Sequence, residues 1–214
     1  MSRTVVSLGL AALAAVTMPV STLSQALVGA RETANGAPIL TSHGTLHARL
    51  EHIARRSSLW REALEQIRGT GRQVLVLTPD QVVVKDTLDS TSTRSFDPTV
   101  VAAAAPIPDP DSQVSLVIVV VNLPLLEGVH RRSYSPLVEL YWDLDRILVH
   151  EIYGHALPYL LAGDLSGRCA DPAPGQKASD ACSIRRENAV RAELGLSRRT
   201  GYGLDLVLTR RRLE

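Results

Sequence analysis

Two histidines and a glutamate lie close together in an apolar stretch of this chain. His150 and Glu151 are adjacent, and His155 follows five residues after His150. The flanking residues are mainly apolar, which predicts a largely buried helix. Buried imidazole and carboxylate groups are costly without partners. Because one metal ion would satisfy both imidazoles, the pattern predicts a zinc site with His150 and His155 as ligands. The alternative is a pair of core histidines satisfied by hydrogen bonds.

The spacing of the two histidines predicts the shape of their helix. Residues four apart lie about 40° apart around an α-helix, whereas a spacing of five separates them by about 140°. Both rings therefore reach one ion only if the helix widens into a π-bulge. Gly154 lacks a Cβ, and Pro158 has no N–H to donate to the carbonyl of Gly154. Both residues make this distortion less costly.

The six residues His150–His155 read His-Glu-Ile-Tyr-Gly-His. They resemble the His-Glu-x-x-Gly-His signature of dipeptidyl-peptidase III, a variant of the zincin metallopeptidases. The resemblance implies that His150 and His155 bind zinc and that Glu151 polarises the attacking water. It also implies a third protein ligand, a glutamate on a following helix. The match covers the hexapeptide alone, so it implies roles for residues and no substrate.

A second resemblance lies downstream, in the segment that runs from Glu187 to Tyr202. Its pattern is Glu187-Asn188-x-x-Arg191-x-Glu193-Leu194-Gly195-Leu196, followed by Arg199 and Tyr202. This pattern resembles the segment after the zinc helix in bacterial effector-type zinc metallopeptidases.

Several acidic residues are candidates for the third zinc ligand. A catalytic zinc site keeps three protein ligands and one open position. Glu187 is the first choice, because it follows a loop long enough to fold back onto the histidines. Glu193 is the second choice, and Asp164 or Asp171 the third. Glu187 has an alternative role as a helix N-terminal carboxylate, which the helix dipole would stabilise.

The predicted chemistry assigns roles to the residues around the ion. Glu151 would take a proton from water and pass it to the leaving amine. Tyr202 is the first candidate to stabilise the developing oxyanion, and Tyr153 the second. Arg191 would orient Glu187 or bind a substrate carboxylate. An ordinary strand tyrosine and a surface arginine are the alternatives for Tyr202 and Arg191.

The elements that must position these residues indicate an α+β fold, zincin-like, in which a small β-sheet packs on helices and one long helix carries the site. Val114 to Asn122 is the most apolar, β-branched run and predicts a strand buried on both faces. Hydrophobic periodicity and turn signals predict the remaining elements. The predicted helices cover 46–67, 135 to 161 or 162 (capped by Ser135, kinked near Pro158 and ended by Gly163) and 183–194; the predicted strands cover 73–78 and 81–85 as a hairpin, 100–107 and 202–208.

The N-terminus and the cysteines indicate export. A positive start, an apolar run from Val5 to Val20 and a small, more polar stretch predict a signal peptide over residues 1–30; an uncleaved membrane anchor is the alternative. Cys169 and Cys182 are the chain's only two cysteines. In an exported protein such a pair predicts a disulfide, with two thiolate metal ligands as the weaker alternative.

Length and charge complete the prediction. The chain has 214 residues and a formal net charge of +1, which gives no indication of a nucleic-acid partner or of stable membrane insertion after cleavage. Residues 31–45 are predicted to be a flexible lead-in and 46–214 a single metallohydrolase domain. The predicted function is a zinc-dependent metallopeptidase, periplasmic or secreted, with peptide or protein substrates. The alternatives are a non-catalytic zinc-binding or interaction protein and a zinc amidase acting on cell-wall material.

Overall fold

A computed structural model of the chain describes residues 38–82, 84–85, 93–94, 100–108, 113–132, 143–163 and 178–199. Its main sheet has the strand order β1-β2-β6-β5. Strands β1, β2 and β6 are parallel, and β5 runs antiparallel to β6. The prediction of an α+β fold with a small sheet is therefore confirmed. The strands are β1 (Ile39–Leu40), β2 (Gln73–Leu77), β5 (Ala102–Pro108) and β6 (Val114–Val121).

Strand β6 lies inside the sheet and is buried on both faces, as its composition predicts. Val117, Val119 and Val121 belong to the larger core, whereas Ile118 and Val120 belong to a second apolar cluster. Successive side chains of a strand point to opposite faces, so the two clusters lie on opposite sides of the sheet. A run of β-branched residues suits a strand in this position.

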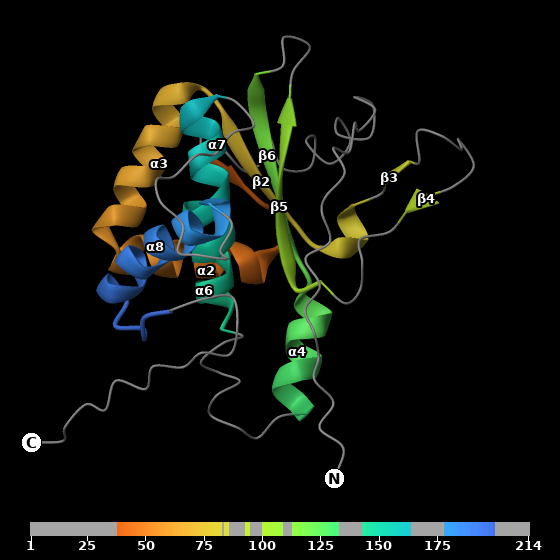
Figure 1. Ribbon diagram of the computed structural model, residues 1–214. Coiled ribbons are helices and arrows are strands. Elements are labelled where there is room, and N and C mark those ends of the chain that lie inside the picture. The colour runs from red at the N-terminus through yellow and green to blue at the C-terminus, as the bar shows by residue number, and fades with distance from the viewer. Residues whose placement is uncertain are drawn as a thin grey trace, which may run out of the picture.

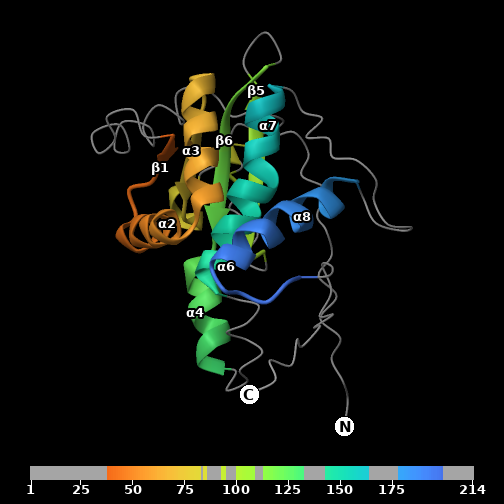
Figure 2. The same ribbon diagram turned by 90° about the vertical axis from the view of Figure 1, so that its left-hand side faces the viewer.

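The helices gather on the face of the sheet that carries the larger core (Figure 1). Three segments, α6, η2 and α7, follow one another without a break over residues 144–162 and are called the site helix below. Figure 2 shows α3 and α7 beside β6, with α8 crossing in front of the site helix. The helices are α2 (Gly44–Arg56), α3 (Ser58–Thr70), α4 (Leu123–Arg132), α6 (Leu144–Leu148), η2 (Val149–Ala156), α7 (Leu157–Ala162) and α8 (Ala178–Glu193).

The structure differs from two predictions in the first half of the chain, the helix over 46–67 and the hairpin over 73–85. The helix predicted over 46–67 is two helices, because Ser57 adopts an extended conformation and its side chain caps α3 by accepting from the Trp60 N–H. The predicted hairpin does not form. Strand β2 pairs with β1 and β6, and the chain after it enters a short 3₁₀ turn, η1 (Pro79–Gln81). Strand β3 (Val84–Lys85) pairs instead with β4 (Thr93–Arg94).

The boundaries of the site helix differ at its start and agree at its end. Asp143 is extended and caps α6, so the site helix begins at Leu144; Ser135, the predicted cap, lies outside the described residues. Its C-terminus is at Gly163 as predicted, in the left-handed conformation with φ of 72°. Helix α4, directly after β6, was not predicted.

Several predictions fall outside the described residues. They include the signal peptide over 1–30 and the strand over 202–208. Ile39–Leu40, within the predicted lead-in, forms β1 and pairs with β2. Among the described helices, none combines the length and apolarity that crossing a membrane requires.

Candidate metal centre

The predicted π-bulge is confirmed at the predicted place. Residues Val149–Ala156 form a π-helical segment, η2, between α6 and α7. The N–H of Leu157 donates to the carbonyl of Ile152, five residues earlier, as the wider helix requires. His150 and His155 both lie within this segment, so the distortion acts on the two residues whose spacing predicted it.

The wider turn brings the two imidazole rings together. His150 Nε2 and His155 Nε2 are 3.2 Å apart, and the rings meet edge to face at an interplanar angle of 86°. Two ligands of a tetrahedral zinc ion, each bonded through nitrogen at about 2.0–2.1 Å, lie about 3.3 Å apart. The separation of the two Nε2 atoms therefore fits a shared zinc ion.

Burial keeps His155 in the form that binds metals. Desolvation, reinforced by the charge of His150, lowers the pKa of His155 to about 3. A neutral imidazole has a lone pair for a cation, whereas a protonated one has none. His150 is also buried, with an exposed fraction of 7%. The candidate donor set is therefore two adjacent imidazoles, of which His155 is neutral at physiological pH.

Glu187 reaches the histidines from α8, but on the far side of the His150 ring. Its Oε2 lies 2.7 Å from His150 Nδ1, while His150 Nε2 faces His155. This contact is the one that a carboxylate makes when it orients a metal-binding histidine from behind. The structure thus brings Glu187 to the site, as predicted, and its predicted role as a zinc ligand stays a prediction.

Three cationic or polar partners hold the Glu187 carboxylate. Arg191 Nη2 lies 2.6 Å from Oε1, and Arg199 Nη1 lies 3.4 Å from Oε2. Burial raises the pKa of Glu187, but the hydrogen bond with His150 and the nearby guanidinium groups outweigh it and hold the pKa below its ordinary value. Glu187, fully buried, is therefore ionised at neutral pH. Of the two roles predicted for Arg191, the structure supports the orientation of Glu187.

Glu151 lies on the same π-turn and is buried, with an exposed fraction of 8%. Burial raises its pKa, and the charges of His150 and Arg199 lower it in part. A carboxyl group in such surroundings exchanges protons more readily near neutral pH than an exposed one. The chemistry available is therefore proton transfer by a carboxyl group on the same turn as the two adjacent imidazoles.

Gly154 allows α8 to approach the π-turn closely. A Cβ at this position would lie 3.0 Å from Ser183 Cβ and 3.1 Å from the Ser183 carbonyl oxygen. A side chain here would make contacts tighter than almost all real Cβ contacts, so Ser183 or its backbone would have to shift by a few tenths of an ångström. Sequence reasoning linked Gly154 only to the distortion of the helix. The structure adds a second reason, since this contact brings Glu187 within reach of His150.

The groups that act on two further predicted residues lie outside the histidine cluster. Glu193 accepts hydrogen bonds from the hydroxyls of Ser57 and Ser58 and from the N–H of Leu59, at the start of α3. The second choice for the third ligand was therefore wrong, because Glu193 caps α3. Tyr153 is half-buried, and burial raises its pKa; the charges that act on its hydroxyl belong to Arg186, Glu62 and Glu193 rather than to the histidine cluster.

The remaining predicted site residues fall outside the described part of the chain. They are Tyr202, Asp164, Asp171 and Cys169. Cys182, in α8, is buried and is not a free thiol. Because the structure does not describe Cys169, the disulfide stays a prediction.

Sequence reasoning missed the roles of Asn188 and Arg199. Both occur in the downstream motif, but no role was predicted for either. Asn188 hydrogen-bonds the backbone of Arg199, and Arg199 contacts Glu187. A long-range contact of this kind has no local signal apart from the presence of Asn and Arg in the motif.

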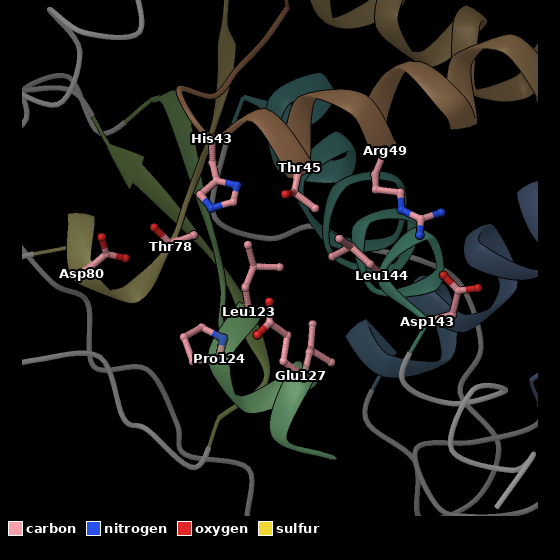
Figure 3. Close-up of a pocket in the computed structure, with 11 residues that line it drawn as sticks. His43, Thr45, Arg49, Thr78, Asp80, Leu123, Pro124, Glu127, Asp143 and Leu144 are labelled. Atoms are coloured by element: carbon pink, nitrogen blue, oxygen red, sulfur yellow. The ribbon is translucent and has the colours of Figure 1, made fainter. Parts of the chain in front are cut away.

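A separate hollow of about 540 Å³ lies at the carboxyl ends of the parallel strands. Figure 3 shows His43 and Thr78 on one side of it, with Leu123 and Glu127 of α4 beneath them. Asp143 and Leu144, at the start of α6, also line the hollow. Neither His150 nor His155 lines it, so it is distinct from the histidine site.

The comparisons with known proteins give no indication of the function of this site. They found no matching family model, no similar curated protein and no similar solved structure. Within the described residues, no group of three or more His, Cys, Asp or Glu side chains is arranged around one point as metal ligands. The candidate centre therefore consists of two imidazoles with Glu187 behind one of them.

Proposed function

We propose that the chain is a zinc-dependent peptide-bond hydrolase of the zincin type that acts outside the cytoplasm. The observation that carries the proposal is the 3.2 Å separation of His150 Nε2 and His155 Nε2 on a π-turn. This separation suits tetrahedral zinc, and it requires an uncommon helical distortion. The carboxylate of Glu187 behind His150 is the support that metal-binding histidines usually have.

The residues around the imidazoles have defined tasks in this proposal. Bound zinc supplies Lewis acidity, which lowers the pKa of water and polarises a carbonyl group. Glu151 accepts the proton of the attacking water and later donates it to the leaving amine. Glu187 fixes the tautomer of His150 by accepting from Nδ1–H, which leaves the Nε2 lone pair for the ion. Arg191 holds Glu187 in this position.

The edge of the sheet beside the π-turn suits an extended peptide. Strand β5 packs against η2, and Val101 accepts from the Asn122 N–H across the β5–β6 ladder. In the register of β5 with β6, Ala102 and Ala104 alternate with residues that bond β6, so their N–H and C=O groups point away from β6, to a side where the described part of the chain pairs no further strand. Pro106 has no N–H to offer there. A peptide adding a strand to this edge would pair with the two alanines.

The substitution Glu151→Gln tests the proposal. It keeps the size and hydrogen-bonding capacity of the side chain but removes the base. We expect hydrolysis of an unstructured protein substrate by the zinc-loaded mature chain to fall by 10²-fold or more, with zinc content unchanged. Glu65→Gln, on the exposed face of α3, is the matched control and should retain full activity.

Other outcomes of this experiment separate the alternatives. Wild-type protein that binds one zinc ion and cleaves neither protein nor cell-wall peptides would support a non-catalytic zinc protein. Cleavage of cell-wall amide bonds alone would support a wall amidase. A chain that binds no zinc at all would refute both the hydrolase and the zinc protein.

A further inference from the structure

The hollow of about 540 Å³ is formed in large part by the segments that directly follow the three parallel strands. His43 follows β1, Thr78 and Asp80 follow β2, and Leu123 follows β6. In open sheets with parallel strands, ligands bind in the crevice outside the carboxyl ends of the strands. The volume is also within the range of small-molecule sites, about 300–1,000 Å³. The place and the size of the hollow therefore both suit a small ligand.

Hydrogen bonds of one side chain fix two sides of the hollow relative to each other. The side-chain oxygen of Gln81, in η1, accepts from the N–H of Thr78 at 2.9 Å and from its hydroxyl at 3.0 Å. The side-chain nitrogen of Gln81 donates to the Ser42 hydroxyl at 2.8 Å, in the segment between β1 and α2. Because these segments are held together without a ligand, little ordering is needed when one binds.

The start of α2 offers a place for an anionic group. Within the described part of the chain, the buried Nδ1 atom of His43 has no hydrogen-bond partner. Figure 3 shows its ring extending from the start of α2 toward Leu123. No side chain caps α2, and its first turn has no acidic residue. The first N–H groups of a helix lack intrahelical acceptors and carry partial positive charge. A carboxylate here would accept from His43 Nδ1–H at the positive end of α2.

Other sides of the same hollow carry carboxylates. Asp80 belongs to η1, Glu127 to α4, and Asp143 immediately precedes α6. Within the described residues, neither Asp80 nor Asp143 takes part in an ion pair, and Asp143 Oδ1 accepts only from the backbone N–H of Asp145. Arg49 also lines the hollow, but its guanidinium lies 3.6 Å from the Asp145 carboxylate. The lining therefore has negative charge for which a ligand's ammonium group would be the counter-charge.

We propose that the hollow binds a short peptide whose two ends are free and whose side chains are apolar. The carboxylate of the peptide lies beside His43 at the start of α2, and its ammonium group lies between Asp80 and Asp143. Its side chains pack on Leu123 and Leu144. The volume exceeds that of a single amino acid, which favours a peptide. A mainly apolar surface with a few polar groups that fix the orientation is the usual plan of such sites.

The inference does not depend on the proposed hydrolase, because neither His150 nor His155 lines the hollow. Calorimetric titration of the Glu151→Gln protein tests it without hydrolysis. The probes are leucyl-leucine, leucyl-leucine amide, which lacks the carboxylate, and acetyl-leucyl-leucine, which lacks the ammonium group. A hydrogen bond to a charged group contributes roughly 10-fold or more in affinity. We expect leucyl-leucine to bind at least about 10-fold more tightly than either derivative.

Two outcomes of this titration would overturn the inference. One is equal affinity for the three probes, or no binding of leucyl-leucine. The other is loss of binding when a chelator removes zinc, since that result would place the peptide at the histidine site. Binding that is unchanged by the chelator supports the hollow, whether or not the wild-type chain hydrolyses peptides.

Variants assign the two preferences to the two sides of the hollow. His43→Ala should lower the preference for the free carboxylate by about 5-fold or more, whereas His47→Ala, on the exposed face of α2, should retain it. Asp80→Asn combined with Asp143→Asn should lower the preference for the free ammonium group by a similar factor. Asparagine caps helices as well as aspartate does, so α6 should remain intact. Preferences that survive in both variants would refute the assigned site.

Discussion

The side chain of Glu187 holds His150 by contacting its Nδ1 atom. It is fully buried, yet the hydrogen bond with His150 and the two guanidinium groups keep it ionised. A carboxylate fixed by so many partners has little freedom to turn toward an ion on the opposite side of the His150 ring. The contact of Glu187 with His150 Nδ1 is therefore that of a carboxylate that orients the His150 ring.

The substitution Glu187→Gln separates orientation from direct ligation. Glutamine still accepts a hydrogen bond from His150 Nδ1–H but has no charge. If Glu187 orients the ring, zinc affinity should fall by roughly 10- to 100-fold, and one zinc ion should still bind at high zinc concentration. Competition titration with a chelating dye measures this directly. His155→Ala, which removes a ligand, is the reference for complete loss. Glu187→Gln that behaves like His155→Ala would identify Glu187 as the third ligand.

The position of the site residues depends on the packing of α8 against η2. Gly154 lies against Ser183, where a Cβ would approach Ser183 to 3.0 Å and would require a small shift of α8. The same crossing places Glu187 beside His150. The glycine in the motif is therefore explained by helix packing as much as by the π-turn.

Substitution of Gly154 by alanine should disturb stability and metal binding together. Overpacking of this kind costs about 1–3 kcal/mol, and separation of the helices should weaken the His150–Glu187 contact. Urea unfolding and zinc titration measure the two effects. Gly69→Ala, in α3 with open space around its Cβ position, is the control and should be neutral or stabilising by up to about 1 kcal/mol. Equal stability of Gly154→Ala and Gly69→Ala would show that the close contact is not required.

Local patterns predicted the elements whose signals are local. The apolar run of β6 predicted a buried strand correctly, and Gly163 predicted the end of the site helix correctly. The spacing of His150 and His155 predicted the π-turn, because residues five apart lie on one face of a helix only where the helix widens. By contrast, the pairing of β2 with β1 and β6 depends on residues far apart in the sequence. The same is true of Glu193, whose partners are at the start of α3, and of the hydrogen bonds between Asn188 and Arg199.

At the scale of the whole molecule, the site connects two parts of the helical layer. His150 and His155 lie on the helix that continues from α6 to α7, and Glu187 comes from α8. α8 contacts α3 as well as η2, and α7 packs on α3 and β6. A ligand that fixes the two histidines therefore acts on the packing of the helices against the sheet, and its binding should be detectable in the stability of the entire fold.

Zinc should accordingly raise the unfolding temperature. A ligand that binds only the folded state at a concentration 1,000 times its Kd stabilises that state by about 4 kcal/mol. For a chain of this size the expected rise in Tm is roughly 10 °C, measured by scanning calorimetry with and without a chelator. His155→Ala should abolish the rise. His47→Ala should retain it, because His47 is exposed on α2 and pairs with Glu51. A zinc-dependent rise that persists in His155→Ala would place the ion elsewhere, because the folded state gains stability only from sites that folding assembles.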